Sequence, residues 1–227
     1  MQTNNLIRWS GLSFLIGGVL YAINGFFHLN NNDPQVTFSP VWLSIQIIIT
    51  IFYALDILGL LGLHSYQRDK AGLLGLIGIV LAIIGSTLTF ISSIGFAFVI
   101  PTVTAQLATP QSPTELISST GPLAWIGTLV LAWIFAFIPG HILIGISVIR
   151  AGILPRWSGI LIFIAMILVF IGAASAQLFW LRNIGGVLSG AGLAWLGYFL
   201  FSDQKAGYRL TAVSRGEGQE DQKKKQK

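Results

Sequence analysis

Two ionisable side chains lie deep inside long apolar stretches of this 227-residue sequence. Asp56 is the only acidic or basic residue well inside such a stretch, and His141, in "IFAFIPGHILIGIS", is the only histidine in that position. An isolated charge in lipid costs at least about 2.5–3.5 kcal/mol, and a neighbouring partner is the usual remedy. Because an acid and an imidazole in a low dielectric share their protons, the two residues indicate either proton handling or a structural clasp.

Two neighbours of His141 favour a polar pocket around it, and a tyrosine is a candidate third member of the site. Pro139 has no N–H, so it frees a backbone carbonyl near residue 135 and bends the helix. Gly140 allows a neighbouring helix to approach closely. Tyr53, one helical turn before Asp56, is a candidate third member of the site, although a tyrosine in such a place is more often a packed aromatic side chain.

The composition that surrounds these residues is typical of an integral membrane protein. The chain is 54% hydrophobic and only 9% charged, whereas soluble domains carry about a quarter charged residues. More than half of the basic residues lie beyond residue 200. Long apolar runs followed by a charged tail predict an all-α, polytopic membrane protein. The chain has no cysteine, which excludes disulfides and thiol chemistry.

Six apolar segments are long enough, at about 1.5 Å of rise per residue, to cross a hydrocarbon core of about 30 Å. They predict a bundle of six transmembrane helices over residues 7–29, 41–66, 71–100, 122–149, 157–177 and 183–201. The bundle forms one domain, 1–201. The polar, lysine-rich remainder, 202–227, is predicted to be a disordered basic cytoplasmic tail.

The basic residues predict the orientation of this bundle. With six crossings, twelve lysines and arginines lie on the side of the termini, and only Arg182 lies on the opposite side. Basic residues favour the cytoplasmic side, so both termini are predicted to be cytoplasmic. The predicted location is the cell membrane, with anionic lipid headgroups next to the basic tail. Tryptophans at predicted helix ends fit this placement: Trp9, Trp42, Trp125, Trp157 and Trp180.

The orientation places Asp56 and His141 at nearly the same depth. Both predicted helices, 41–66 and 122–149, run towards the cytoplasm. Each residue lies about nine or ten positions before the cytoplasmic end of its helix, roughly 12–15 Å below the boundary. We therefore expect Asp56 and His141 to face the bundle interior and to meet, directly or through water.

The sequence offers no sign of a metal, a cofactor or a catalytic centre. The other two histidines, His28 and His64, lie at opposite membrane boundaries, too far apart to share a metal ion with His141. No phosphate-binding loop or hydrolase motif is present, and nothing marks a catalytic nucleophile. No basic, aromatic-rich face indicates nucleic acid. No cofactor or metal is therefore predicted, and an enzyme is the least favoured class.

Other patterns concern packing and connections. Small residues at four-residue spacing, as in Gly186, Gly190 and Ala194, favour close helix packing within the monomer, with a homodimer as the alternative. "SPTE" at 112–115 predicts a capped short helix in the loop 101–121, either a plain connector or a lid. "RWSG" occurs at residues 8–11 and 156–159, which indicates either a parallel repeat of helical hairpins or a recurring interfacial anchor.

One stretch carries a family resemblance. "RAGILPRW", residues 150–157, ends one predicted helix and begins the next. It resembles six-helix bacterial integral membrane proteins of uncharacterised function, in which an Arg-Ala-Gly turn precedes Pro-Arg-Trp. The resemblance covers about one helical hairpin. It implies a polytopic bundle in a bacterial inner membrane and brings no activity or site residues.

Two functions stay open at this point. The first is a small transporter or channel in which Asp56 and His141 handle a proton, with Tyr53 as an accessory group. The alternative is a non-catalytic scaffold or accessory subunit, which acts through helix packing against a membrane-protein partner or a second copy. The few polar residues in the spans disfavour a wide aqueous pathway.

Overall fold

The computed structural model describes residues 2–29, 31–109, 111–174 and 176–202, and this part of the chain is helical with no strand. Five helical stretches within it are long and apolar enough to cross a membrane: Asn5–Phe27, Trp42–Thr104, Ala124–Ala151, Arg156–Ala174 and Phe179–Ser202. The predicted all-α fold is confirmed. The predicted tail lies outside the described residues, except that Ser202 still belongs to the last helix.

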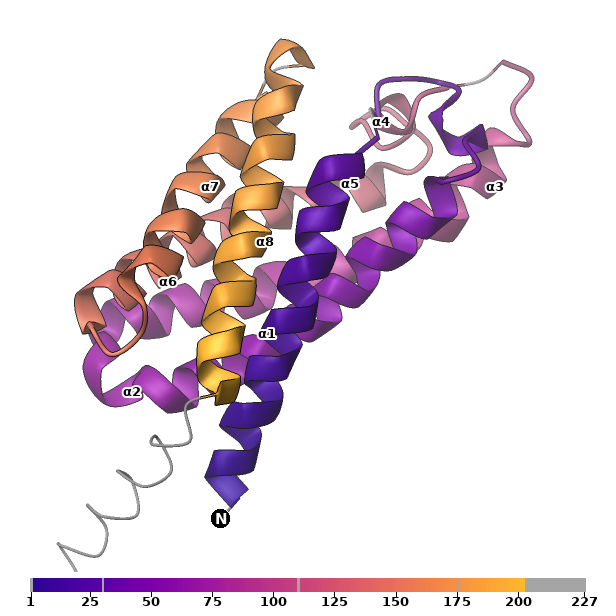
Figure 1. The fold of residues 1–227 in the computed structure, drawn as a ribbon. Coiled ribbons are helices and arrows are strands. Elements are labelled where there is room, and N and C mark those ends of the chain that lie inside the picture. The colour runs from indigo at the N-terminus through magenta and orange to yellow at the C-terminus, as the bar shows by residue number, and fades with distance from the viewer. Residues whose placement is uncertain (1, 30, 110, 175, 203–227) are drawn as a thin grey trace, which may run out of the picture.

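Figure 1 shows the arrangement of these elements. The helices are α1 (Gln2–Phe27), α2 (Trp42–Ile94), α3 (Ile100–Thr104), α4 (Pro113–Leu116), α5 (Ala124–Ala132), α6 (Ile138–Ala151), α7 (Arg156–Ala174) and α8 (Phe179–Ser202). Short 3-10 turns, η1 (Val36–Phe38) and η4 (Ala176–Leu178), lie in the connections. Two π-helical turns, η2 (Gly95–Val99) and η3 (Trp133–Phe137), interrupt long helical stretches.

Helix α2 folds back on itself at Gly72. This residue has φ 60° and ψ −166°, a backbone conformation that only glycine adopts readily. Hydrogen bonds then join the two halves as antiparallel neighbours: Thr50 Oγ1 donates to Ser93 Oγ at 2.8 Å. The element therefore contains the second and third predicted segments, joined by a turn at one glycine.

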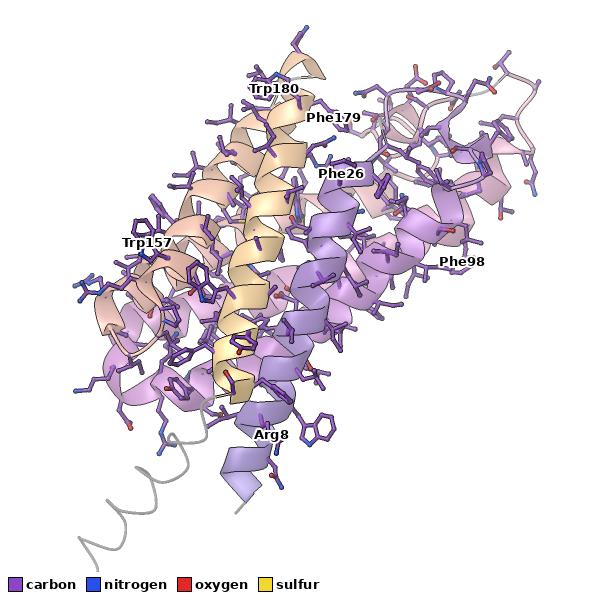
Figure 2. All side chains as sticks on the ribbon, in the orientation of Figure 1. Arg8, Phe26, Phe98, Trp157, Phe179 and Trp180 are labelled. Atoms are coloured by element: carbon purple, nitrogen blue, oxygen red, sulfur yellow. The ribbon has the colours of Figure 1, made fainter. Side chains whose placement is uncertain are left out.

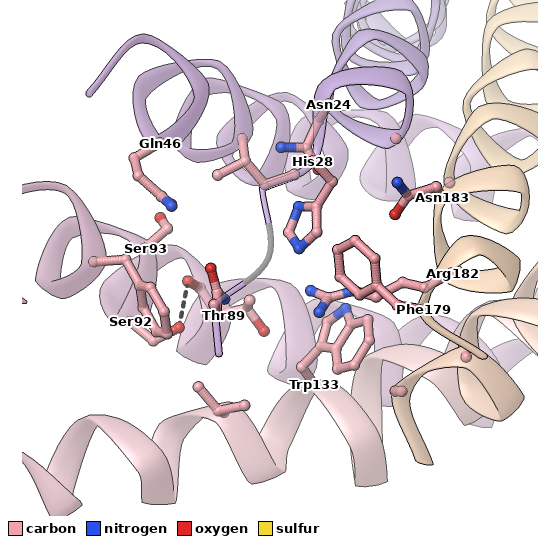
Figure 3. A pocket seen from close by; sticks show the side chains of 18 of the residues that line it. Asn24, His28, Gln46, Thr89, Ser92, Ser93, Trp133, Phe179, Arg182 and Asn183 are labelled. Carbon is pink, nitrogen blue, oxygen red and sulfur yellow. Dashed lines mark hydrogen bonds between the residues drawn. The ribbon is translucent and has the colours of Figure 1, made fainter. Parts of the chain in front are cut away.

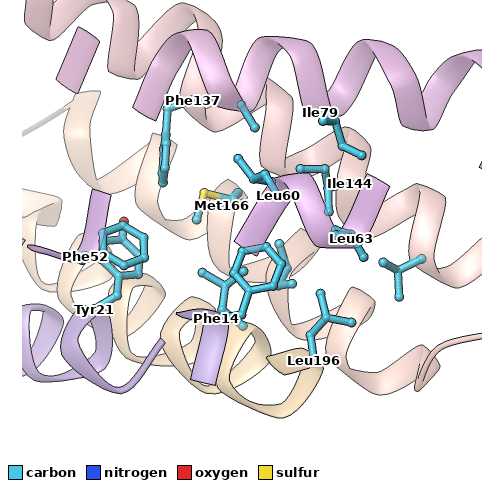
Figure 4. Close-up of a cluster of buried hydrophobic side chains, with 14 of the residues drawn as sticks. Phe14, Tyr21, Phe52, Leu60, Leu63, Ile79, Phe137, Ile144, Met166 and Leu196 are labelled. Atoms are coloured by element: carbon cyan, nitrogen blue, oxygen red, sulfur yellow. The ribbon is translucent and has the colours of Figure 1, made fainter. Parts of the chain in front are cut away.

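The long helices form a closed ring around an apolar core. Helix α1 packs between α8 and α2, while α6 packs between α2 and α7, and α7 closes the ring against α8. The core is a cluster of buried side chains from all of these helices (Figure 4), among them Phe14, Leu60, Leu63, Ile144, Met166 and Leu196. Dispersion between such closely packed atoms, not the hydrophobic effect, holds helices together in lipid.

Small residues decide how closely the helices approach. A methyl group at Gly190 would overlap the backbone of Gly18 and Ala22 on α1, and one at Gly186 would meet Gly25. The small-residue stripe of α8 is therefore covered by α1 within the monomer, as predicted. Since this stripe is already covered, it is not a free surface for a homodimer.

The two "RWSG" copies each lie between two neighbouring segments of the ring. Ser10 lies against Gly62 on the next segment of the ring, and the Ser158 carbonyl lies close to Gly192 on the segment that follows α7. The adjacent glycines, Gly11 and Gly159, each lie against the segment on the other side, α8 and α6 respectively. Any helix of such a ring has a neighbour on each side, so the parallel repeat of hairpins and the recurring anchor both stay predictions.

Both π-helical turns end two residues before a proline, Pro101 or Pro139. Proline has no N–H, and its ring crowds the carbonyl four residues earlier, so the turn before it widens. At Ile100 the N–H bonds to the Gly95 carbonyl, five residues back. The predicted disturbance by Pro139 thus takes the form of a widened turn.

Two other details differ from the predictions. The last helix begins at Phe179 instead of residue 183, which places Arg182 within its first turns. Trp42 does not lie at the surface: it is buried, and its ring N–H donates to the Phe96 carbonyl at 3.1 Å. Other aromatic side chains do project from the bundle (Figure 2), including Phe26, Phe98, Trp157 and Trp180.

Candidate functional site

Asp56 and His141 meet in the centre of the bundle. Asp56 lies on the first half of α2 and His141 on α6, and neither has any solvent-exposed surface. The His141 Nε2 atom lies 3.3 Å from Asp56 Oδ1. The predicted contact is therefore confirmed, and it is direct. The contact joins α2 and α6 through two residues that are 85 positions apart in the chain.

Two further hydrogen bonds fix both side chains. Ser86, on the second half of α2, donates from Oγ to Asp56 Oδ2 at 2.6 Å. His141 Nδ1 lies 3.0 Å from the carbonyl oxygen of Phe137, one turn earlier. A carbonyl only accepts hydrogen bonds, so Nδ1 must carry a hydrogen there. Ser86 is therefore the third member of the polar site. This was not expected, because a hydroxyl in an apolar helix usually bonds to the backbone of its own helix.

This geometry fixes the number of protons that the pair holds. With Nδ1 protonated, a neutral His141 presents a lone pair at Nε2, so Asp56 must then donate as a carboxylic acid. If Asp56 is ionised, His141 must be an imidazolium that donates from Nε2. Both forms hold one proton between Nε2 and Oδ1, and both have no net charge. The pair thus avoids a buried net charge in either form.

The local helix geometry positions His141. Gly140 lies against the backbone of Ala82, so α6 and the second half of α2 approach more closely than a larger residue would permit. The π-helical turn η3 ends at Phe137, which both accepts the His141 hydrogen bond and packs its ring 4.1 Å from the imidazole. The roles predicted for Pro139 and Gly140 are structural: they shape the helix around the pair.

Tyr53 is not hydrogen-bonded to the pair within the described residues. Its ring packs at 5.5 Å edge-on against Phe137 and at 5.1 Å from Phe52, which in turn stacks on Tyr21 at 4.3 Å. These four rings form a buried layer next to Asp56 and His141. Tyr53 is thus a packed aromatic side chain. It also borders a cavity on the other side of this aromatic layer.

This cavity of about 310 Å³ lies at the end of the bundle that carries the loops 28–41 and 105–123. Its volume is at the lower end of the range for small-molecule sites, about 300–1,000 Å³. Polar side chains from α1, both halves of α2, and α8 line it (Figure 3), among them Asn24, Gln46, Thr89, Ser92, Ser93 and Asn183. Tyr21 and Tyr53 also line it, so the aromatic layer is its floor.

Arg182 is the cation of this cavity. Its guanidinium lies over the Trp133 ring, 4.9 Å from the centroid, with His28 and Phe179 close by (Figure 3). No acidic side chain of the described residues lies within ion-pair distance of it. Arg182 is partly exposed; a cation–π contact contributes only about 0.5–2 kcal/mol, and the ring carries no net charge. The ring alone therefore does not neutralise this charge.

Some of these residues can be anticipated from the sequence and others cannot. Asn24 and Gln46 stand out as amides in apolar helices, and in the structure they line the cavity. The hydroxyls of Thr89, Ser92 and Ser93 bond to their own helix backbone, as expected for such residues. In the sequence, Arg182 stands out only as the single basic residue on the side of the membrane opposite the termini. That observation indicates the orientation of the helices and does not indicate a binding site.

Among the described residues, no group of three histidine, cysteine, aspartate or glutamate side chains is placed to hold a metal ion. His28 lies at the cavity, and His64 lies about two helical turns beyond Asp56 on the first half of α2. The arrangement at Asp56 and His141 suits movement of a proton, and the arrangement at Arg182 suits binding of an anion. No family model, no curated protein and no solved structure matches this chain.

Proposed function

We propose that the chain crosses the cell membrane of a bacterium six times, with both termini in the cytoplasm. The break of α2 at Gly72 supports six crossings, because residues 42–71 and 73–104 are each long enough to span the bilayer. The bias of twelve basic residues to one supports the orientation. In this orientation the cavity faces outward, and the basic residues lie beside anionic headgroups of the cytoplasmic leaflet.

The absence of native cysteine allows a clean test of this topology. Asp69→Cys and Ser119→Cys place single thiols at exposed positions on opposite ends of the bundle. We expect a membrane-impermeant maleimide to label Ser119→Cys in intact cells and to label Asp69→Cys only after permeabilisation. The reverse pattern would contradict the orientation, and labelling of both in intact cells would contradict the six crossings.

We further propose that the protein is a small proton-coupled transporter. The observation that carries this proposal is the buried Asp56–His141 pair, which holds one proton in two forms of equal net charge. A pair of this kind gains or loses its proton when a conformational change opens it to water, and intramembrane ionisable pairs serve this purpose in transporters. The polar cavity next to the pair supplies room for a solute.

Reconstitution tests the transport proposal even while the solute is unidentified. The purified full chain is placed in vesicles that contain a pH-sensitive dye, and an inward proton gradient is imposed. A panel of neutral, anionic and cationic small solutes is then added outside. We expect at least one solute to accelerate proton influx in a saturable way. Influx equal to that of protein-free vesicles with every solute would contradict the proposal.

A further inference from the structure

We propose that the cavity around Arg182 is a binding site for a small organic monocarboxylate that also carries a hydroxyl group. The inference names the ligand class of the proposed transporter, and in that sense it rests on the proposed function. Its test, however, is equilibrium binding, which requires no transport. Three features carry it: the charge of the cavity, the geometry of its cation and the polar atoms left without partners.

The charge of the cavity calls for one negative charge on the ligand. None of the described residues that line it is acidic, and Arg182 is the one arginine or lysine among them. Arg182 has no ion-pair partner in the described part of the chain. Asp56 does not line the cavity, and the Asp56–His141 pair has no net charge in either of its forms. A monoanion therefore complements the cavity, while a dianion would bring a second charge with no partner.

The geometry of the cation favours a carboxylate. A guanidinium is a planar fork that binds the two oxygens of a carboxylate side by side. The contact with the Trp133 ring, 4.9 Å from its centroid, holds the guanidinium at the cavity, where its N–H groups can meet a ligand. Phe179 and the Trp133 ring add apolar surface on the same side (Figure 3), which suits an organic body instead of a bare ion.

Unpartnered polar atoms around the cavity call for a donor on the ligand. Asn183 Oδ1, Asn31 Oδ1 and His28 Nε2 are buried and have no hydrogen-bond partner among the residues that the structure describes, and all three residues line the cavity. Buried polar atoms without partners are rare in folded proteins, and each one points to a group that satisfies it, such as ordered water, an ion or a ligand. A ligand hydroxyl can donate to either asparagine oxygen, and it can donate to His28 Nε2 or accept from it, depending on the tautomer; it adds no charge.

The loops that contain Asn31 and Thr114 cover the cavity on the side away from the membrane centre. The N–H and the hydroxyl of Thr114, on α4, both donate to the Asn31 carbonyl, at 3.2 and 3.0 Å. The capping box of Ser112 and Glu115 holds α4 in place, as the sequence predicted. Thr114 and Ile117 both line the cavity. The segment thus has the position of a lid, not of a remote connector.

Calorimetric titration of the full chain in an uncharged detergent tests the inference. The probes are lactate, mandelate and phenyllactate, each with its neutral amide, together with phenylacetate and inorganic phosphate. We expect at least one hydroxy acid to bind, its amide to bind at least tenfold more weakly, and phenylacetate to bind more weakly than mandelate. Arg182→Gln should abolish binding, and Arg182→Lys should weaken it, because lysine lacks the planar fork.

Arg8→Gln is the matched control, because Arg8 makes the same type of contact with Phe201, 5.2 Å from the ring centroid, at the other end of the bundle. This variant should bind like the native chain. Binding of the amides as tightly as the acids, no binding of any hydroxy acid, or binding retained in Arg182→Gln would overturn the inference. Tighter binding of phosphate than of every carboxylate would overturn it in favour of a phosphate or lipid headgroup.

The comparison of acids with amides uses the native chain, so it does not depend on whether an Arg182 variant folds. The outcomes also separate the two proposals. Binding of a hydroxy acid without proton-coupled influx would contradict the transport proposal alone. Proton influx driven by a different solute, without binding of any hydroxy acid, would contradict the ligand class alone.

Discussion

Asp56→Asn is expected to reduce solute-coupled proton influx to the level of protein-free vesicles. An amide is nearly the same size as a carboxyl group, and its nitrogen can donate to a neutral His141 Nε2 in place of the acid. The contact of 3.3 Å is therefore kept, while the group no longer takes up or releases a proton. Loss of flux with a folded bundle would separate a role in proton movement from a structural clasp.

Two variants complete this experiment. Asp69→Asn is the matched control, because Asp69 is exposed and pairs only with its neighbour Arg68 among the described residues; it should transport like the native chain. His141→Ala should also lose proton-coupled influx, since it removes the other half of the pair. If Asp56→Asn and His141→Ala both retain native influx, the pair has no part in transport.

His141→Ala is expected to destabilise the bundle by about 3–5 kcal/mol. The change removes a buried imidazole and leaves Asp56 Oδ1 without its partner, and breaking a buried pair from one side typically costs this much. Asp56→Ala should have a cost of the same order. The double variant should be destabilised by less than the sum, with a coupling of about 0.5–3 kcal/mol, because neither side chain of the pair is then left facing an empty place.

Denaturant unfolding in mixed micelles measures these differences. His64→Ala is the control: His64 is partly buried, lies on the same helix segment as Asp56 and makes no polar contact with another described residue. It should cost well under half as much as His141→Ala. Additive effects of Asp56→Ala and His141→Ala would mean that the two side chains are not energetically coupled.

The contact between Asp56 and His141 could be predicted because it depends on quantities that a sequence determines well. The rise of an α-helix and the thickness of the bilayer place each residue at a depth, and the cost of a buried charge requires a partner at that depth. The capping box at Ser112 was equally predictable, since it depends on residues three positions apart.

The cavity could not be predicted in the same way. Its lining comes from α1, both halves of α2, η3 and α8, and the rotation of each helix about its axis decides which side chains face inward. That rotation depends on glycine contacts such as Gly18 with Gly190, and on the widened turn before Pro139. Neither follows from hydropathy, which assigns Arg182 to a loop and gives no sign that Ser86 bonds to another helix.

Magnetic resonance can measure how many protons the Asp56–His141 pair holds and on which atoms they lie. Nitrogen-15 magnetic resonance of histidine-labelled protein reports each ring nitrogen, and only three histidines contribute; His141→Ala identifies the signal. We predict that His141 Nδ1 carries a hydrogen, while Nε2 and the Asp56 carboxyl hold one proton between them, the carboxyl being read by carbon-13. An imidazole protonated only at Nε2, beside an ionised Asp56, would mean that the pair carries a net charge and does not have the proton arrangement described above.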